Sequence, residues 1–250
     1  KERDKSADNS DEAIEKWFKR EVLKNACRQL ADTRSFFQKE PDLCLPNQRG
    51  HVRDLANPSD PIIQVALYAL HGKRPALLTR TSHRQSSKAG FVHILDVQDY
   101  LETIRVLALP AEIADYFAFR EDCLLRGQSW EYDEARLVAA FILEQSPSKL
   151  KDGTVRNVLA DALHDVESFD LGNMLVKYGE KVFYYEGGGP GADYYAILNE
   201  FAHMNRVHMR SFRRLRDWAL GKAGSDSAEV PVRMLVPSRG TGFVVFPVAT

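Results

Sequence analysis

The sequence contains only three cysteines, and they lie far apart at Cys27, Cys44 and Cys123. An odd number of widely spaced cysteines argues against a disulfide framework and against a zinc ribbon, and it favours a reducing, cytoplasmic location. No apolar run is long enough to span a bilayer, so we expect no membrane partner. The first residues are charged, which argues against a signal peptide, and the absence of an initial methionine suggests a fragment.

The chain also lacks a large excess of charge and the short motifs of several enzyme classes. Its formal net charge is -1, so a nucleic-acid surface would have to come from local patches. No GxSxG, HExxH or protein-kinase motif occurs, which argues against those enzymes. Asp161 and His164 would share a helical face, but two such residues without a third ligand predict no metal site.

Hydrophobic periodicity predicts an α/β protein. The 250 residues suffice for one large domain or two modest ones, and we place a boundary after Gly127, between an α/β portion (1–127) and an α+β C-terminal region (128–250). The predicted helices cover residues 11–38 with Asp11 as the cap, 97–107 with Asp96 as the cap, 110–126, 133–145, 155–166 and 193–220. The predicted strands cover residues 62–70, for which a helix is the alternative, and residues 91–95, 181–185, 232–236 and 243–248, the last two as a hairpin. Residues 81–90 are expected to form a polar loop.

The first predicted helix has basic residues at four-residue intervals, at Lys16, Arg20, Lys24 and Arg28. Residues four apart lie on one helical face, so these four side chains form a basic stripe. Such a stripe can follow a phosphate backbone. Nearby glutamates leave open the alternative of a solvated face that is stabilised by ion pairs.

The last predicted helix is rich in arginine, with Arg206, Arg210, Arg213, Arg214 and Arg216. The planar guanidinium group suits two-point contacts to phosphate, so this helix is a second candidate for nucleic-acid binding. A structural or interface helix is the alternative.

Several segments together resemble a bacterial group of PD-(D/E)XK, or restriction-endonuclease-like, nucleases. The segments are EKWFKREVLKNACRQLAD, LPNQRG, IIQVALYAL, FVHILDVQDYLETI and LPAEIADYFAFRE, with a weaker likeness through the arginine-rich helix and PSRGTGFVVFPV. The resemblance implies a mixed sheet flanked by helices, followed by a mainly helical region with a terminal hairpin.

In the family that the chain resembles, an Asp and a Glu-x-Lys unit on adjacent strands form the metal site. The carboxylates hold Mg²⁺, the lysine helps to activate water, and a following helix often supplies a glutamine. The resemblance assigns these last two roles to Lys1 and Gln29. The carboxylates have no counterpart, because Glu2 and Asp4 follow Lys1 instead of preceding it.

Three functions are compatible with these features. The first is metal-dependent hydrolysis of DNA, in defence or DNA processing. The second, favoured by the missing carboxylates, is a non-catalytic module that binds nucleic acid or protein on the same scaffold. The third is an unrelated small-molecule enzyme with dispersed site residues. Fold alone does not decide among them, and a homo-oligomer is compatible with each.

Overall fold

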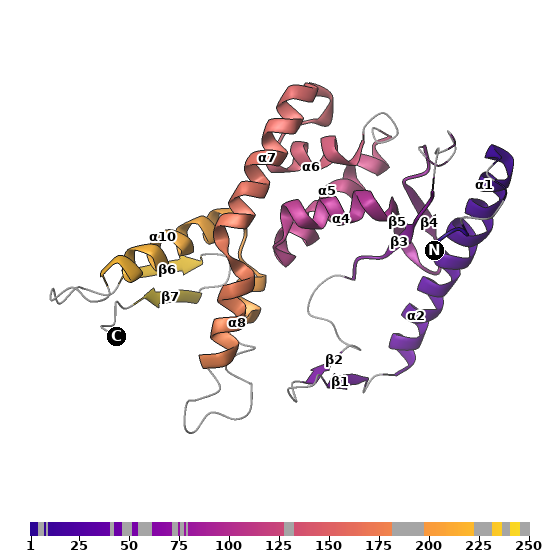
Figure 1. Cartoon of the computed structure of the whole chain (residues 1–250). Helices are drawn as coiled ribbons and strands as arrows, with labels where there is room; N and C mark the ends of the chain where they lie inside the picture. Colours follow the sequence, from indigo (N-terminus) through magenta and orange to yellow (C-terminus); the bar gives the residue numbers. More distant parts are fainter. Residues whose placement is uncertain are drawn as a thin grey trace. The chain divides into compact units, whose positions relative to one another are not determined.

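The computed structural model describes residues 1–4, 8, 10–40, 43–46, 52–54, 62–71, 75, 78, 80–127, 133–181, 198–222, 232–236 and 241–245 (Figure 1). The protein is of mixed α/β class, with a small mixed sheet and many helices. Its contacts divide it into unit 1 (Lys1–Val106 and Ile113–Asp161) and unit 2 (Leu107–Glu112 and Ala162–Thr250). The boundary predicted after Gly127 lies within unit 1.

Unit 1 contains a three-stranded sheet in the order β3-β5-β4. β3 (Val65–Tyr68) runs parallel to β5 (Gly90–Asp96), and β4 (His83–Ser86) is antiparallel to β5. β5 confirms the strand predicted from the apolar run over 91–95. The prediction of a polar loop over residues 81–90 was wrong, since β4 lies within this segment. The side chains of β4 are polar and give no strand pattern, so the strand is recognised only by its backbone pairing with β5.

The N-terminal residues lie parallel to β3, beside its C-terminal end. The Lys1 amine donates to the Leu67 carbonyl at 2.7 Å, and the Ala69 N–H donates to the Lys1 carbonyl at 2.9 Å. A parallel bridge joins Glu2 to Ala69. Residues 1–3 therefore extend the sheet on the side of β3 that faces away from β5.

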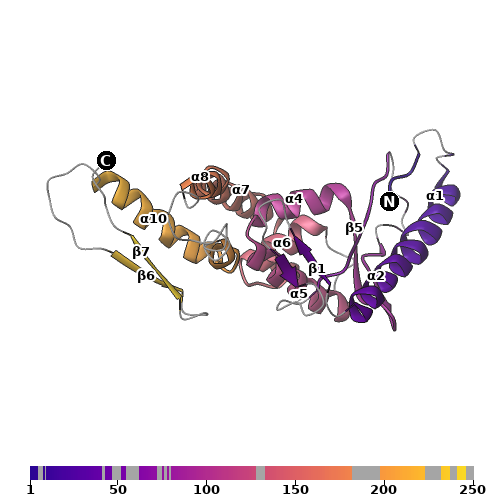
Figure 2. The same cartoon turned by 90° about the horizontal axis from the view of Figure 1, so that it is seen from below.

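One long helix covers a face of this sheet (Figures 1 and 2). It consists of α1 (Asp11–Phe18), the π-helix η1 (Lys19–Ala26) and α2 (Cys27–Lys39). The predicted cap was wrong by one residue: the Ser10 hydroxyl accepts the Ala13 N–H, and Asp11 is the first helical residue. Asp8 holds Ser10 in place, by accepting its backbone N–H at 2.9 Å and its hydroxyl at 3.0 Å.

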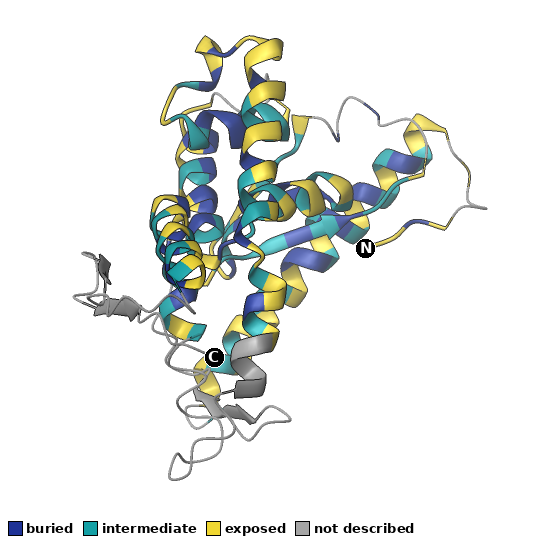
Figure 3. Ribbon diagram, turned by 60° about the vertical axis from the view of Figure 1, so that its left-hand side comes forward, coloured by how far each residue is buried: buried dark blue, intermediate teal, exposed yellow. Residues whose placement is uncertain are grey.

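Further helices complete unit 1, together with β1 (Cys44–Pro46) and β2 (Val52–Asp54), which pair antiparallel. They are α4 (Val97–Leu107), α5 (Pro110–Leu125), α6 (Glu134–Ile142) and α7 (Asp152–Phe169), and α4, α5 and α7 extend into unit 2. The Asp96 carboxylate accepts the Gln98 N–H at 2.9 Å, which confirms the predicted cap of α4. Buried and exposed residues alternate along the helices, as amphipathic sequences require (Figure 3).

A buried polar cluster joins β5, α5 and α6. The Arg120 side chain, in a residue only 1% exposed, donates from Nε to the Glu134 carboxylate oxygens at 2.8 and 3.1 Å. Its Nη1 donates to the Ser82 carbonyl at 3.2 Å and lies 3.1 Å from Nδ1 of His93. The Tyr116 hydroxyl also donates to Glu134. Burial, and then the charge of Arg120, lower the pKa of His93 to about 3, so His93 is neutral and Nδ1 accepts.

Unit 2 contains α8 (Leu171–Lys181), α10 (Arg206–Lys222), β6 (Val232–Val236) and β7 (Thr241–Val245). β6 and β7 form the predicted antiparallel hairpin, which lies beside α10 (Figures 1 and 2). The strand predicted over 181–185 was wrong at Lys181, the last residue of α8, and its other positions lie outside the described residues. Among the described residues of unit 2, one core cluster consists of Leu109, Phe169, Met174, Phe201, Met204, Met209 and Phe212.

The single helix predicted over 193–220 was wrong. Residues 198–202 are helical, residues 203–205 are not, and α10 begins anew at Arg206. The interruption is stabilised at the start of α10, where the Asn205 side chain accepts the His208 N–H at 3.0 Å and Glu112 accepts the Arg206 N–H at 2.8 Å. Among the described residues, no helix has both the length and the apolar content that crossing a bilayer requires.

Candidate nucleic-acid interface

The basic stripe lies on the solvent side of the long helix. Its four residues are all exposed, and each follows by two positions one of the buried residues Ile14, Phe18, Val22 and Ala26. Two residues correspond to about 200° of rotation in an α-helix, so the basic and buried series occupy opposite faces. The packing of the buried series on the sheet therefore directs the stripe toward solvent.

The π-helical stretch explains why a four-residue repeat stays on one face. In an α-helix, four residues turn about 40° more than one full revolution, so the repeat would drift around the helix. Between Lys19 and Ala26 the helix has the wider turns of π geometry, which bring the local repeat closer to four residues. The Arg84 side chain, from β4, donates to the Leu23 carbonyl in the middle of this stretch.

The length of the stripe suits an extended phosphate backbone. From Lys16 to Arg28 the helix rises by at most about 18 Å, the value for 1.5 Å per residue, because the wider π turns shorten it. One DNA strand presents a phosphate about every 3.4 Å along its axis, so the stripe is as long as about four or five phosphates. The long helix therefore provides a row of cations of useful length.

Acidic neighbours occupy only part of this surface. Glu15 pairs with Lys19 at 3.5 Å, and Glu21 pairs with Arg20 at 2.6 Å. Hydrogen bonds from Asn25, and then from Arg20, lower the pKa of Glu21. The side chains of Lys16, Lys24 and Arg28 form no hydrogen bond or ion pair with another described residue. The solvated-face alternative therefore accounts for Arg20 better than for the other three.

Lys1 and Gln29, the two residues to which the resemblance assigns site roles, lie on an extended segment and on α2. Lys1 is exposed on the extended segment beside β3, and its charge contributes to the lowered pKa of Glu21. Gln29 is exposed on α2. No hydrogen bond or ion pair joins Lys1 to Gln29 in the described part of the chain.

The carboxylates in the described part of the chain do not fit the Mg²⁺ site that the resemblance implies. No three His, Cys, Asp or Glu side chains there are grouped closely enough to hold a metal ion. Glu2 instead lies 3.3 Å from Nε2 of His71. We therefore assign no metal-dependent step to these residues.

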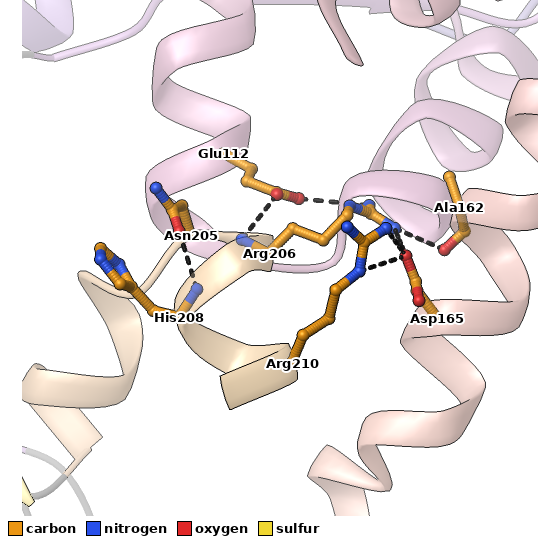
Figure 4. A network of polar contacts seen from close by, with 7 residues as sticks. All are labelled: Glu112, Ala162, Asp165, Asn205, Arg206, His208 and Arg210. Atoms are coloured by element: carbon orange, nitrogen blue, oxygen red, sulfur yellow. Dashed lines mark hydrogen bonds and ion pairs between the residues drawn. The ribbon is translucent and has the colours of Figure 1, made fainter. Parts of the chain in front are cut away.

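The arginines of α10 differ in their surroundings. Arg206 is only 6% exposed, and its guanidinium donates to the Ala162 carbonyl at 2.6 Å and to Glu112 at 3.2 Å (Figure 4). Asp165 lies 3.6 Å from the same guanidinium. Because its surroundings enclose it, we leave Arg206 out of the proposed nucleic-acid surface.

Arg210 binds Asp165 at the edge of this cluster (Figure 4). Burial alone would raise the pKa of Asp165, but hydrogen bonds and charge from Arg210, and then from Arg206, outweigh burial and lower it. Burial raises the pKa of Glu112, which Arg206 only partly offsets. Glu112 and Asp165 thus hold the first turn of α10, a role that their sequence positions did not suggest.

The remaining arginines of α10 lie nearer the surface. Arg213 pairs with Asp217 at 3.4 Å, and Arg214 is exposed. Arg216 donates to the Phe169 carbonyl at 3.1 Å and pairs with Asp217 at 3.0 Å. Arg210, Arg213 and Arg214 therefore remain candidates for phosphate contact, although two of the three already have an acidic partner.

Comparisons of this chain with protein-family models, with curated proteins and with solved structures find no match.

Proposed function

We propose that this protein binds nucleic acid, with DNA as the partner, through phosphate contacts to the basic stripe. The observation that supports this proposal most is the exposure of four basic side chains along one helix, opposite its buried face. Three of them have no partner among the described residues. Each phosphate that such a side chain neutralises releases counterions, which favours binding and makes it sensitive to salt.

Replacing Lys16, Lys24 and Arg28 together by alanine should weaken binding to duplex DNA and reduce its salt dependence. The slope of log Kd against log salt concentration should fall by about three, since each phosphate contact contributes about 0.9. Fluorescence anisotropy titrations at several salt concentrations measure this slope. The matched control replaces the exposed residues Lys149, Lys151 and Arg156 of unit 1. Equal slopes for the two triple variants would contradict the proposal.

Metal-dependent DNA hydrolysis is a second candidate function. The observation that favours it is the extended segment at Lys1 beside β3, followed by a helix with Gln29 on its surface. The resemblance implies this order of strand and helix. The missing carboxylates would have to come from outside these 250 residues, with a Glu two positions before Lys1.

A plasmid-nicking assay with Mg²⁺ or Mn²⁺ tests this second candidate. We expect no nicking by the 250-residue chain, and metal-dependent nicking by a form whose upstream reading frame supplies the Glu and an Asp on the preceding strand. Replacing Lys1 by alanine in that form should reduce the rate by about a hundredfold, the lower range for loss of a proton-transfer group. An upstream sequence without these carboxylates, or unchanged nicking by the Lys1→Ala variant, would overturn the hydrolysis proposal and leave the binding proposal intact.

A further inference from the structure

Two arginines connect the β4–β5 hairpin to the long helix. Arg84 of β4 donates to the Leu23 carbonyl, and Arg34 of α2 donates to the Ala89 carbonyl at 3.1 Å. Gly90 allows the second contact: its φ is 83°, and a Cβ there would lie 3.0 Å from Nη1 of Arg34. The hairpin is therefore held beside the part of the long helix in which the basic stripe ends.

The residues gathered by these contacts are strongly basic. Between Glu21 and Asp32 the helix has no acidic residue, and residues 82–91 of the hairpin have none either. Lys88 is exposed in the hairpin turn, where its backbone N–H donates to the Ser86 hydroxyl at 3.3 Å. Five exposed basic side chains lie on these two connected segments and are called the hairpin patch: Lys24, Arg28, Arg34, Arg84 and Lys88.

The two connecting arginines are oriented in advance for an anion. Arg34 and Arg84 are both exposed, and each uses Nη1 for its carbonyl contact. A guanidinium has five N–H donors, so each arginine keeps donors for a phosphate oxygen. Because the carbonyl contact already restricts the side chain, less conformational entropy is lost when phosphate binds.

We propose that the nucleic-acid surface continues from the basic stripe onto the hairpin patch, where Arg34, Arg84 and Lys88 contact the phosphate backbone. This inference rests on the proposed function, since it takes DNA as the partner. It adds β4 and the hairpin turn to a surface that the sequence placed on helices alone.

Charge reversal at the turn tests the hairpin patch. Lys88→Glu should weaken binding to duplex DNA by about tenfold at moderate salt and lower the salt slope by at least about one. Lys88→Arg should bind like the native chain. The control is Lys151→Glu, the same change at an exposed position of unit 1 outside the patch, which should leave the slope unchanged. Thermal melting checks that each variant is folded.

The outcomes separate this inference from the proposed function. If the triple stripe variant loses binding while Lys88→Glu binds like the native chain, the hairpin patch is overturned and the proposed function stands. If Lys88→Glu loses binding and Lys151→Glu does not, the patch is supported. If neither the stripe variant nor Lys88→Glu changes binding, both proposals fail.

Discussion

Replacing Arg120 by alanine should lower the free energy of unfolding by about 3–5 kcal/mol, because Glu134 would remain as a buried charge without its partner. The exposed fractions of the two side chains are 2% and 11%, so water can compensate little. The Ser82 carbonyl and the neutral His93 ring would also lose a donor. Urea denaturation followed by circular dichroism measures the change.

Two further variants distinguish this pair from an ordinary ion pair. Arg126→Ala removes a surface ion pair with Asp122, and it should change stability by less than about 1 kcal/mol. Replacing Arg120 by methionine and Glu134 by leucine together should restore much of the stability that Arg120→Ala loses, since neither charge remains buried. A loss for Arg120→Ala no larger than that for Arg126→Ala would show that the cluster is not needed for the fold.

Replacing Glu112 by alanine should destabilise unit 2 by a similar amount, about 3–5 kcal/mol. Arg206 would lose both of its contacts to this carboxylate, and its backbone N–H at the start of α10 would lose its acceptor. Hydrogen exchange of the amides in the first turn of α10 should increase first, because this turn depends directly on Glu112.

Two variants serve as references for the Glu112 prediction. Glu112→Gln keeps an oxygen acceptor for the Arg206 N–H, so its effect should be smaller than that of alanine. Asp217→Ala removes only exposed ion pairs of α10 and should leave amide exchange in the first turn unchanged. Normal protection of that turn in Glu112→Ala would rule out the capping role.

The sequence predicted the elements whose side chains follow a clear pattern. β5 and the long helix have continuous or periodic apolar residues, and these patterns reflect the burial that stabilises them. The terminal hairpin was predicted from two apolar segments on either side of a turn. β4 was missed because its polar side chains carry no such pattern. The π-helical stretch was missed because it depends on hydrogen bonding that residue types do not specify.

The candidate site was predictable only in part, for the same physical reason. The basic stripe could be recognised in the sequence because it lies on one helix. Arg34 and Arg84 join the proposed nucleic-acid surface only through contacts with residues that are distant in the sequence. One sequence signal for the burial of Arg206 was available, since Arg206 lies three residues before the buried Met209 and so on the same helical face. Its partner Glu112 lies 94 residues earlier in the chain, and no local pattern connects them.

This long separation has a consequence for the order of folding. Residues 107–112 and 162–250 together form unit 2, and residues 113–161 of unit 1 lie between them in the chain. A nascent chain therefore presents Leu109 and Glu112 well before the helix that they contact has been synthesised. Closing so long a loop costs entropy that only late contacts recover. We infer that unit 2 completes its core after the intervening part of unit 1 has formed. A ribosome that pauses after residue 161 would therefore hold a chain whose unit 1 is folded and whose unit 2 is still unfolded.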